Sequence, residues 1–273
     1  MKIGITEAGD ASLDYTWVEK APEMDMMILI TKNVTDKFIR EALKFADKTI
    51  IHATCTGYGG TKLEPGAPNW KVQIDQTRKL IAMGFPQEQI VVRIDPIFPT
   101  PKGIAMVERI VEAAQPDLKR FRISVLDNYP HVKTRFTALG MPIMYNGQFQ
   151  ASDEEFAAVD LMLSKLKFRF GVTFESCAEP KLTKADPVGC VNTKDMSIFG
   201  LKPAGGRKKK QRGECLCAAG KTEMLPFNHF WWCGKDQCAI TKGTACSLGD
   251  CKKCEHLEIY GCPNRCAYCY WKT

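Results

Sequence analysis

Short apolar runs rich in β-branched residues alternate with longer segments in which apolar positions recur at helical spacing. The runs predict strands at 2–5, 26–31, 49–54, 90–95, 121–126 and 170–176. The longer segments predict helices at 35–47, 69–83, 103–114, 130–139 and 152–168. Strand and helix in strict turn are typical of a parallel sheet with right-handed crossovers, so we expect an α/β fold that is closed or partly closed into a barrel.

Polar segments follow four of the predicted strands: "TEAGD" (6–10), "CTGYGG" (55–60), "RIDPIFP" (93–99) and "ESCAEP" (175–180). In such a sheet the carboxyl ends of the strands meet at one rim, where ligands bind. The glycines of the second segment would let backbone N–H groups approach a ligand, although a simple turn explains them equally simply. Together the four segments predict a site at this rim.

The pattern changes after residue 180. From 181 to 255 the chain is rich in Gly, Lys, Pro and Cys and has little periodicity, which is typical of a lobe organised by metal. A last apolar run at 256–261 predicts a strand, and it leads directly into "CPNRCAYC" at 262–269.

The composition of the 273 residues, 45% hydrophobic and 25% charged, is that of a globular protein. No apolar run approaches the roughly 18 residues of a membrane span, and the N-terminus turns acidic too early for a secretory signal, so we expect a cytoplasmic protein without a membrane partner. The net charge is +7, with a basic run, "GRKKKQR", at 206–212. That run is consistent with a solvated loop and with a phosphate-contacting patch alike.

Thirteen cysteines in a reducing compartment favour metal thiolates over disulfides. Ten of them lie between Cys215 and Cys269, and the last three are spaced C-x3-C-x2-C. Three thiolates so close together suit a cubane cluster whose fourth iron stays open to a small ligand. A zinc site that takes Cys254 or His256 as its fourth ligand is the alternative.

The stretch "CPNRCAYC" resembles the signature of the radical SAM superfamily. The resemblance implies that Cys262, Cys266 and Cys269 bind a 4Fe-4S cluster and that Tyr268 is the customary aromatic residue. The series "TGYGG", "RIDP", "SCAE", "RGECLC" and "YGCPNRCAYCYW" is similar to a radical-SAM-like family often labelled DNA repair photolyase, by analogy with spore photoproduct lyase. That family implies reductive cleavage of S-adenosylmethionine (SAM) to a 5'-deoxyadenosyl radical, with a flavodoxin or ferredoxin as electron donor.

The resemblance also implies a circularly permuted partial (β/α) TIM-type barrel with a Cys-rich metal-binding C-terminal lobe. The barrel would comprise 1–180 and 256–273, and the lobe 181–255. The superfamily's usual "GGE" is absent, and "EAGD" offers Glu7, Gly9 and Asp10 as its replacement in SAM binding.

Arg93 and Asp95 are two further candidates at the rim. They would either contact SAM or the substrate or form a structural ion pair. His52 lies inside an apolar strand, which favours a packed core histidine over a ligand.

The remaining cysteines suggest one or more auxiliary metal sites, either iron–sulfur clusters or zinc. By the resemblance, Cys177, Cys190, Cys215 and Cys217 form one ligand set. A second set would come from Cys233, Cys238, Cys246, Cys251 and Cys254. Cys177 has an alternative role as a hydrogen-atom donor in catalysis, and Glu175 and Tyr58 are the other catalytic candidates.

For the substrate we expect a nucleobase in DNA or a nucleotide, with either modification of a thymine-derived base or repair of a thymine lesion. The basic run and the aromatic stretch "FNHFWWC" (227–233), which could stack on a base, support this expectation. A peptide or a small metabolite is the alternative substrate. A zinc-organised nucleic-acid-binding protein without redox chemistry is the alternative from a different class.

Overall fold

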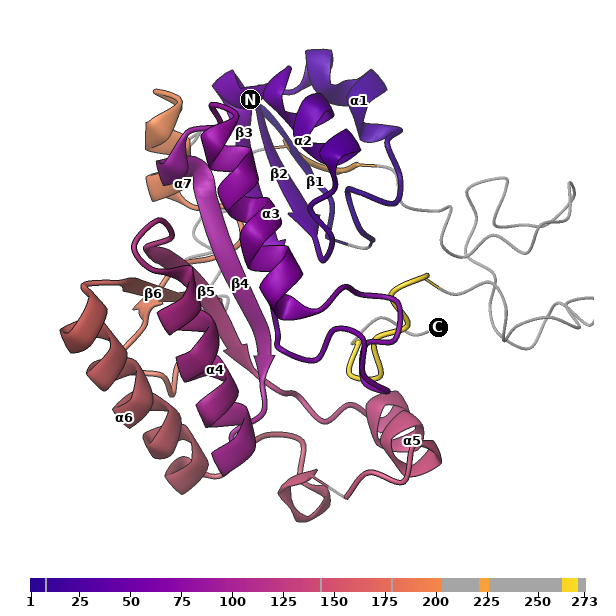
Figure 1. Ribbon diagram of the computed structural model, residues 1–273, viewed down its shortest axis with the longest axis vertical. Helices are drawn as coiled ribbons and strands as arrows, with labels where there is room; N and C mark the ends of the chain where they lie inside the picture. Colours follow the sequence, from indigo (N-terminus) through magenta and orange to yellow (C-terminus); the bar gives the residue numbers. More distant parts are fainter. Residues whose placement is uncertain (8, 143, 178, 203–220, 226–261, 270–273) are drawn as a thin grey trace, which may run out of the picture.

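The computed structural model describes residues 1–7, 9–142, 144–177, 179–202, 221–225 and 262–269 (Figure 1). Within these residues the strands are β1 (Lys2–Ile5), β2 (Met26–Thr31), β3 (Thr49–Thr54), β4 (Ile90–Ile97), β5 (Arg120–Val125), β6 (Thr173–Ser176), β7 (Asp186–Pro187) and β8 (Lys221–Met224). The α-helices are α1 (Trp17–Lys20), α2 (Asp36–Leu43), α3 (Trp70–Ala82), α4 (Pro101–Ala114), α5 (Pro130–Ala138), α6 (Asp153–Phe170) and α7 (Thr193–Ile198). Single turns of 3-10 helix lie at Ala21–Glu23, Ala46–Lys48, Gln87–Gln89 and Met144–Gly147.

All eight strands form one open parallel sheet in the order β7-β6-β5-β4-β3-β2-β1-β8. From β1 to β7 each strand pairs with its successor in the chain, and a helix lies between the strands of every pair from β1 to β6. β8 is the exception. It comes from much later in the chain and pairs with β1 at the edge of the sheet. The carboxyl ends of the strands therefore lie at one edge, which is where the predicted rim segments meet.

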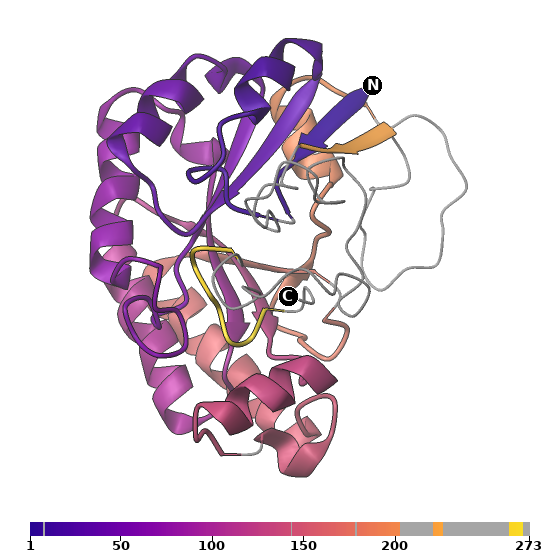
Figure 2. The ribbon, with the colours of Figure 1, turned by 90° about the vertical axis from the view of Figure 1, so that its right-hand side faces the viewer.

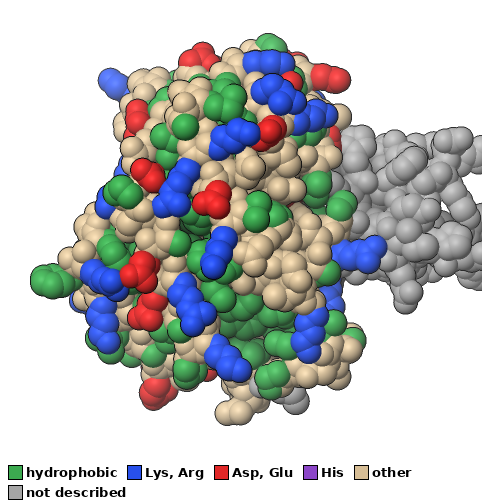
Figure 3. All heavy atoms as spheres, in the orientation of Figure 1, with side chains coloured by type: hydrophobic (Ala, Val, Ile, Leu, Met, Phe, Trp, Pro, Cys, Tyr) green, Lys and Arg blue, Asp and Glu red, His purple; other side chains and the backbone are tan. Residues whose placement is uncertain are grey.

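The outer face of the sheet carries the main hydrophobic core. Alternate strand residues such as Leu29, Ile51 and Val92 are fully or almost fully buried against the helices. Helices α2, α3, α4 and α6 cover this face, whereas the segment 262–269 lies on the concave side (Figure 2). Basic and acidic side chains intermingle on the exposed surface of the helical face (Figure 3).

The inner face has a smaller apolar core and a polar half. Ile3, Ile28, Ile50 and Val91 pack with Met196 of α7, so that this helix covers the inner face over β1–β4. From the middle of β4 onward the inward residues are charged or polar instead, and they include Arg93 on β4, Arg120 and Arg122 on β5 and Glu175 on β6. The chemistry of the inner face therefore changes between β3 and β5.

The structure confirms the six predicted strands and five predicted helices, with shifted ends. α6 begins at a capping box in which Ser152 and Glu155 exchange hydrogen bonds, and it ends at Gly171 with φ 60°. Because α6 extends to Phe170, the strand predicted from residue 170 begins only at Thr173. α2 ends at Leu43, since Lys44 and Phe45 donate to carbonyls three residues back.

The structure also shows elements from the stretch that the sequence analysis assigns to the Cys-rich lobe. β7 and β8 form the two edges of the sheet, and α7 packs on its inner face. The strand predicted at 256–261 lies outside the described residues. Among the described helices, none combines the length and the apolar character that a membrane crossing requires.

Candidate functional site

A cavity of about 270 Å³ opens at the carboxyl ends of the strands, between the inner face and the segment 262–269. Residues at the ends of β1 to β6 line it. They include members of three predicted rim segments, 6–10, 93–99 and 175–180, whereas no residue of the segment 55–60 is in the lining. The predicted site residues in its lining are Glu7, Gly9, Asp10, Arg93, Asp95, Cys177, Cys190, Cys262, Cys266, Tyr268 and Cys269. Segments far apart in the sequence thus share one cavity.

The cysteine loop, residues 262–269, presents all three of its thiols to this cavity. Turns hold its shape, because Arg265 N donates to Cys262 O at 2.9 Å and Cys269 N to Cys266 O at 3.1 Å. The three thiols are half-buried. Burial raises the pKa of Cys262 to about 11 and that of Cys266 to about 12. A soft cation would have to displace those protons in order to bind.

Backbone contacts dock the cysteine loop on the segment that follows Tyr58. Ala267 N donates to Leu63 O at 2.9 Å, and Gly66 N donates to Asn264 O at 3.3 Å. A Cβ at Gly66 would lie 1.8 Å from Pro263 O, so a side chain cannot occupy this position without moving the loop. The glycine in "EPG" thus serves the docking of a loop about 200 residues away in the chain.

Asp10 anchors the loop from the first strand. Its Oδ2 accepts from Asn264 Nδ2 at 2.8 Å and from Lys32 N at 2.8 Å. Its Oδ1 accepts from the hydroxyls of Thr31 at 2.6 Å and Ser12 at 2.9 Å. Asp10, a predicted contact of SAM, lines the cavity, and its carboxylate joins β1, β2 and the cysteine loop.

Lys32 and Glu64 support the loop from the other side, and sequence reasoning missed both. Lys32 Nζ lies 2.6 Å from Glu64 Oε1 and donates to Tyr268 OH at 3.0 Å. Glu64 is almost fully buried, and its second oxygen accepts from Thr56 Oγ1 at 2.8 Å. Burial lowers the pKa of Lys32, but the negative charges of Cys266 and Glu64 outweigh it and raise that pKa above its ordinary value. In the sequence, the only feature that could have pointed to this pair was a lysine directly after the strand predicted at 26–31.

Arg93 and Asp95 form an ion pair at the cavity, and Ser124 Oγ donates to Asp95. The pair is therefore both structural and cavity-lining. His52 is buried, as predicted, with Nε2 3.2 Å from Arg122 Nη1. Burial and the Arg122 charge lower the pKa of His52 well below its ordinary 6.5, so the ring is neutral.

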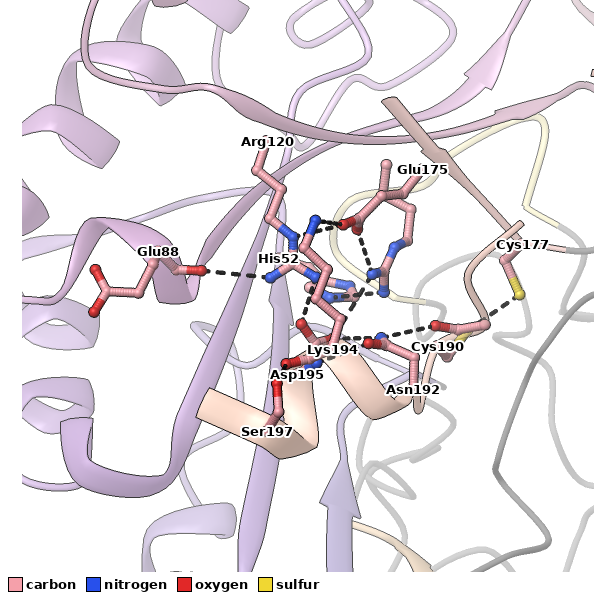
Figure 4. A network of polar contacts seen from close by, with 12 residues as sticks. His52, Glu88, Arg120, Glu175, Cys177, Cys190, Asn192, Lys194, Asp195 and Ser197 are labelled. Carbon is pink, nitrogen blue, oxygen red and sulfur yellow. Dashed lines mark hydrogen bonds and ion pairs between the residues drawn. The ribbon is translucent and has the colours of Figure 1, made fainter. Parts of the chain in front are cut away.

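Glu175 lies behind the cavity, outside its lining. Its carboxylate contacts Arg120 Nε at 2.8 Å, Arg122 Nη2 at 2.7 Å and Lys194 Nζ at 2.6 Å (Figure 4). Burial would raise the pKa of Glu175, but the two guanidinium groups and Lys194 lower it to about 2. Asp195 of α7 also binds Arg120, so this charge network joins α7 to β5 and β6. Glu175 therefore ties β6, the strand that precedes Cys177, to β5.

Tyr58 likewise lies outside the cavity lining. Its ring makes an edge contact with Phe98 at a centroid distance of 4.9 Å, and a second one with Tyr268 at 6.5 Å. Burial raises its pKa. Tyr58 thus packs behind the aromatic residue of the cysteine loop.

A second thiol group faces the cavity at the end of β6. Cys177 Sγ and Cys190 Sγ are 3.7 Å apart. The hydrogen bond from Cys190 lowers the pKa of Cys177 to about 7, and it raises the pKa of Cys190. The other predicted auxiliary ligands, Cys215, Cys217, Cys233, Cys238, Cys246, Cys251 and Cys254, lie outside the described residues.

Glu179, which the sequence analysis did not select, also lines the cavity. Its Oε1 accepts from Val125 N at 2.9 Å. Burial raises the pKa of this carboxyl to about 8, and the nearby Asp127 and Asp95 add to the effect. Glu179 therefore carries its proton over most of the physiological pH range.

The donors of the cysteine loop are of the kind that an iron–sulfur cluster takes. In the described part of the chain, no group of three or more His, Cys, Asp or Glu side chains is arranged to hold a metal ion. Three half-buried thiols at one cavity, beside a buried cation, nevertheless match the softness and the negative charge of a three-cysteine cluster.

Residues 13–222 match a family model described as "Domain of unknown function (DUF1848)". The match spans well over half of the chain, so the chain belongs to this family. It includes β2 to β7, whereas Asp10 and the cysteine loop lie outside it. No match was found among the curated proteins or among the solved structures.

Proposed function

We propose that this member of the DUF1848 family is a radical SAM enzyme, in which Cys262, Cys266 and Cys269 hold a 4Fe-4S cluster. One observation carries the proposal: the three thiols of C-x3-C-x2-C line the cavity at the carboxyl edge of a parallel sheet. Ligand sites of α/β sheets lie at this edge. The family description names no function, and the support comes from the residues at this cavity.

The proposed fold is a circularly permuted partial barrel. β1 is near the N-terminus but is not an edge strand, because β8, from much later in the chain, pairs with it in parallel. A strand from later in the chain therefore lies beside β1, which supports a permuted order, although it is β8 and not the strand at 256–261 that we expect directly before the cysteine loop. The cysteine loop would then correspond to the loop that other superfamily members carry near their N-terminus.

Around the cluster site the chain supplies charge and position. Lys32 holds a positive charge beside Cys266 and donates to Tyr268 OH, which offsets part of the negative charge of three thiolates. Asp10 fixes Asn264 in the middle of the loop. When bound, the cluster would supply the electron that cleaves SAM to the 5'-deoxyadenosyl radical, taken in turn from a flavodoxin or ferredoxin.

The remaining cavity residues are the proposed contacts of SAM and of the substrate. Glu7, Gly9, Arg93 and Asp95 lie at the ends of β1 and β4 and face the same space. Apolar groups make up most of the surface there, which helps to exclude water from a reactive radical. Asp10 is assigned to positioning, because loop and strand donors surround its carboxylate.

As substrate we propose a nucleobase in DNA or a nucleotide. Tyr129 lines the cavity and stacks on His131 with ring centroids 5.5 Å apart, which provides an aromatic surface of the kind that bases stack on. Asp95 and Asp127 offer carboxylate acceptors nearby for base N–H groups. Salt-dependent binding of single-stranded DNA would support a nucleic-acid substrate. Absence of binding at low salt would favour a nucleotide, a peptide or a metabolite.

The decisive experiment is anaerobic reconstitution with iron and sulfide, followed by incubation with SAM and dithionite. We expect a brown protein with about four irons per cluster and formation of 5'-deoxyadenosine. The triple variant C262A/C266A/C269A should lose both properties, whereas C55S should keep them, because Cys55 is buried away from the cavity lining. A colourless protein with stoichiometric zinc, or a loaded cluster without 5'-deoxyadenosine, would overturn the proposal.

A further inference from the structure

We propose that Cys177 and Cys190 form a redox-active dithiol that faces the cavity and closes to an intramolecular disulfide by exchange with a small organic disulfide. This site is separate from the cysteine loop, and it does not depend on the cluster chemistry proposed above. Three features support it: the sheet register, the charge network behind it and the access from the cavity.

The register of β6 and β7 brings the two thiols together. Glu175 pairs with Asp186 and Ser176 with Pro187, and Val188 N continues the ladder by donating to Ser176 O at 2.8 Å. Cys177 and Cys190 follow these pairs on neighbouring segments. Their sulfur atoms end 3.7 Å apart, so only a small approach is needed to reach the disulfide bond length of about 2.05 Å.

The charge network holds both segments in place (Figure 4). Glu175, two residues before Cys177, binds Arg120, Arg122 and Lys194. On the other side, Asn192 Nδ2 donates to Gly189 O at 3.1 Å, and Asn192 Oδ1 accepts from Asp195 N at 2.8 Å. The bend that carries Cys190 is thereby fixed to the start of α7.

Both thiols are accessible from the cavity, which their half-buried side chains help to line. Arg93 and Arg122 line the same cavity and bring positive charge to it. Cys55 provides the contrast within this chain: it is buried and its Sγ donates to Trp70 O at 3.6 Å. Only the Cys177–Cys190 pair combines proximity, access and neighbouring positive charge among the described cysteines.

The chemistry is thiol–disulfide exchange in two steps. The Cys177 thiolate attacks one sulfur of the small disulfide, forms a mixed disulfide and releases one small thiolate. The Cys190 thiolate then attacks Cys177 Sγ, closes the Cys177–Cys190 bond and releases the second thiolate. The two protein thiols lose two electrons and two protons, and one small disulfide is reduced to two small thiols.

The test exposes the full-length protein anaerobically to cystamine, alkylates the remaining thiols and maps tryptic peptides. Cleavage after Arg169, Lys181, Lys184 and Lys194 places the two cysteines in separate peptides, 170–181 and 185–194. We expect these peptides to appear joined, lighter by two hydrogens than the two free thiol peptides together, and to separate on reduction. C190S should instead retain one cysteamine on Cys177, and Cys55 should remain a free thiol.

Two results would overturn the proposal. In the first, Cys177 and Cys190 are both recovered alkylated after cystamine treatment at a concentration that modifies other accessible thiols. In the second, both are protected from cystamine and from the alkylating reagent, and a chelator releases them together with a metal, which would make them metal ligands. Because the readout is a peptide linkage, a protein that makes no 5'-deoxyadenosine still tests this proposal fully.

Discussion

The two thiol groups at the cavity are held in different ways. Cys177 and Cys190 follow paired strands and are fixed from behind by a buried charge network. Cys262, Cys266 and Cys269 lie on a loop that depends on contacts with Asp10, Lys32 and the segment around Leu63. Strand register can thus place two residues with few further contacts, whereas a loop needs several separate anchors to reach the same cavity.

Arg120→Met should have the largest effect, because it leaves Glu175 and Asp195 buried with fewer partners. Breaking a buried charge cluster on one side costs about 3–5 kcal/mol, and we expect the free energy of unfolding in urea to fall by that amount. The matched control is Arg169→Met at the exposed pair with Glu112, which should cost at most about 1 kcal/mol. Equal losses in the two variants would contradict the assigned role of the network.

Lys32→Met should act on the cysteine loop and spare the Cys177–Cys190 pair. The buried Glu64 carboxylate then loses its ion pair, and Tyr268 loses a donor, so we expect a loss of about 2–3 kcal/mol. The double variant K32M/E64Q should recover part of it, since no unpaired charge remains. Alkylation rates measured by mass spectrometry should rise at Cys266 and stay unchanged at Cys177. A rise at both sites would show that the two groups share one support.

Asp10→Asn should have an intermediate effect on the same loop. The aspartate accepts from Thr31, Ser12, Lys32 and Asn264, and an amide can replace only part of this acceptor capacity. We expect a loss of about 1.5–3 kcal/mol in the free energy of unfolding. Iron bound after reconstitution should fall more in D10N than in D14N, because the Asp14 carboxylate accepts from Thr16 and not from the cysteine loop.

His52 should produce the smallest effect, which is seen only as a pH dependence. Its pKa is lowered in the folded state, so below the ordinary value of 6.5 the unfolded chain takes up a proton that the folded protein does not. Its contribution to stability is therefore present above pH 6.5 and is lost as the pH falls, at up to about 1.4 kcal/mol per pH unit. H52Q should lower this slope between pH 6.5 and 5 in urea titrations. An unchanged slope would mean that His52 is not the group responsible.

The parallel sheet and its outer helices were predictable from local pattern. The strands β1 to β5 and the helix α6 follow from apolar runs, helical spacing and the Ser152 capping box, which act over a few residues. The rim was predictable as well, because polar segments after parallel strands must meet at one edge. The elements β7, α7 and β8 were missed, since each is short and depends on packing against strands that are distant in the sequence.

The alternation of strand and helix, the rim and the C-x3-C-x2-C spacing can be recognised in the chain alone, because all three depend on residues close together in it. Which side chains share the cavity depends instead on contacts between distant parts of the chain. In the folded protein Asp10 contacts the cysteine loop, and Lys32 pairs with Glu64 beside Tyr268. Glu175 and Tyr58 lie outside the cavity lining. Cys190 lies next to Cys177. Contacts of this kind depend on strand register and on buried charge compensation, which no local pattern records.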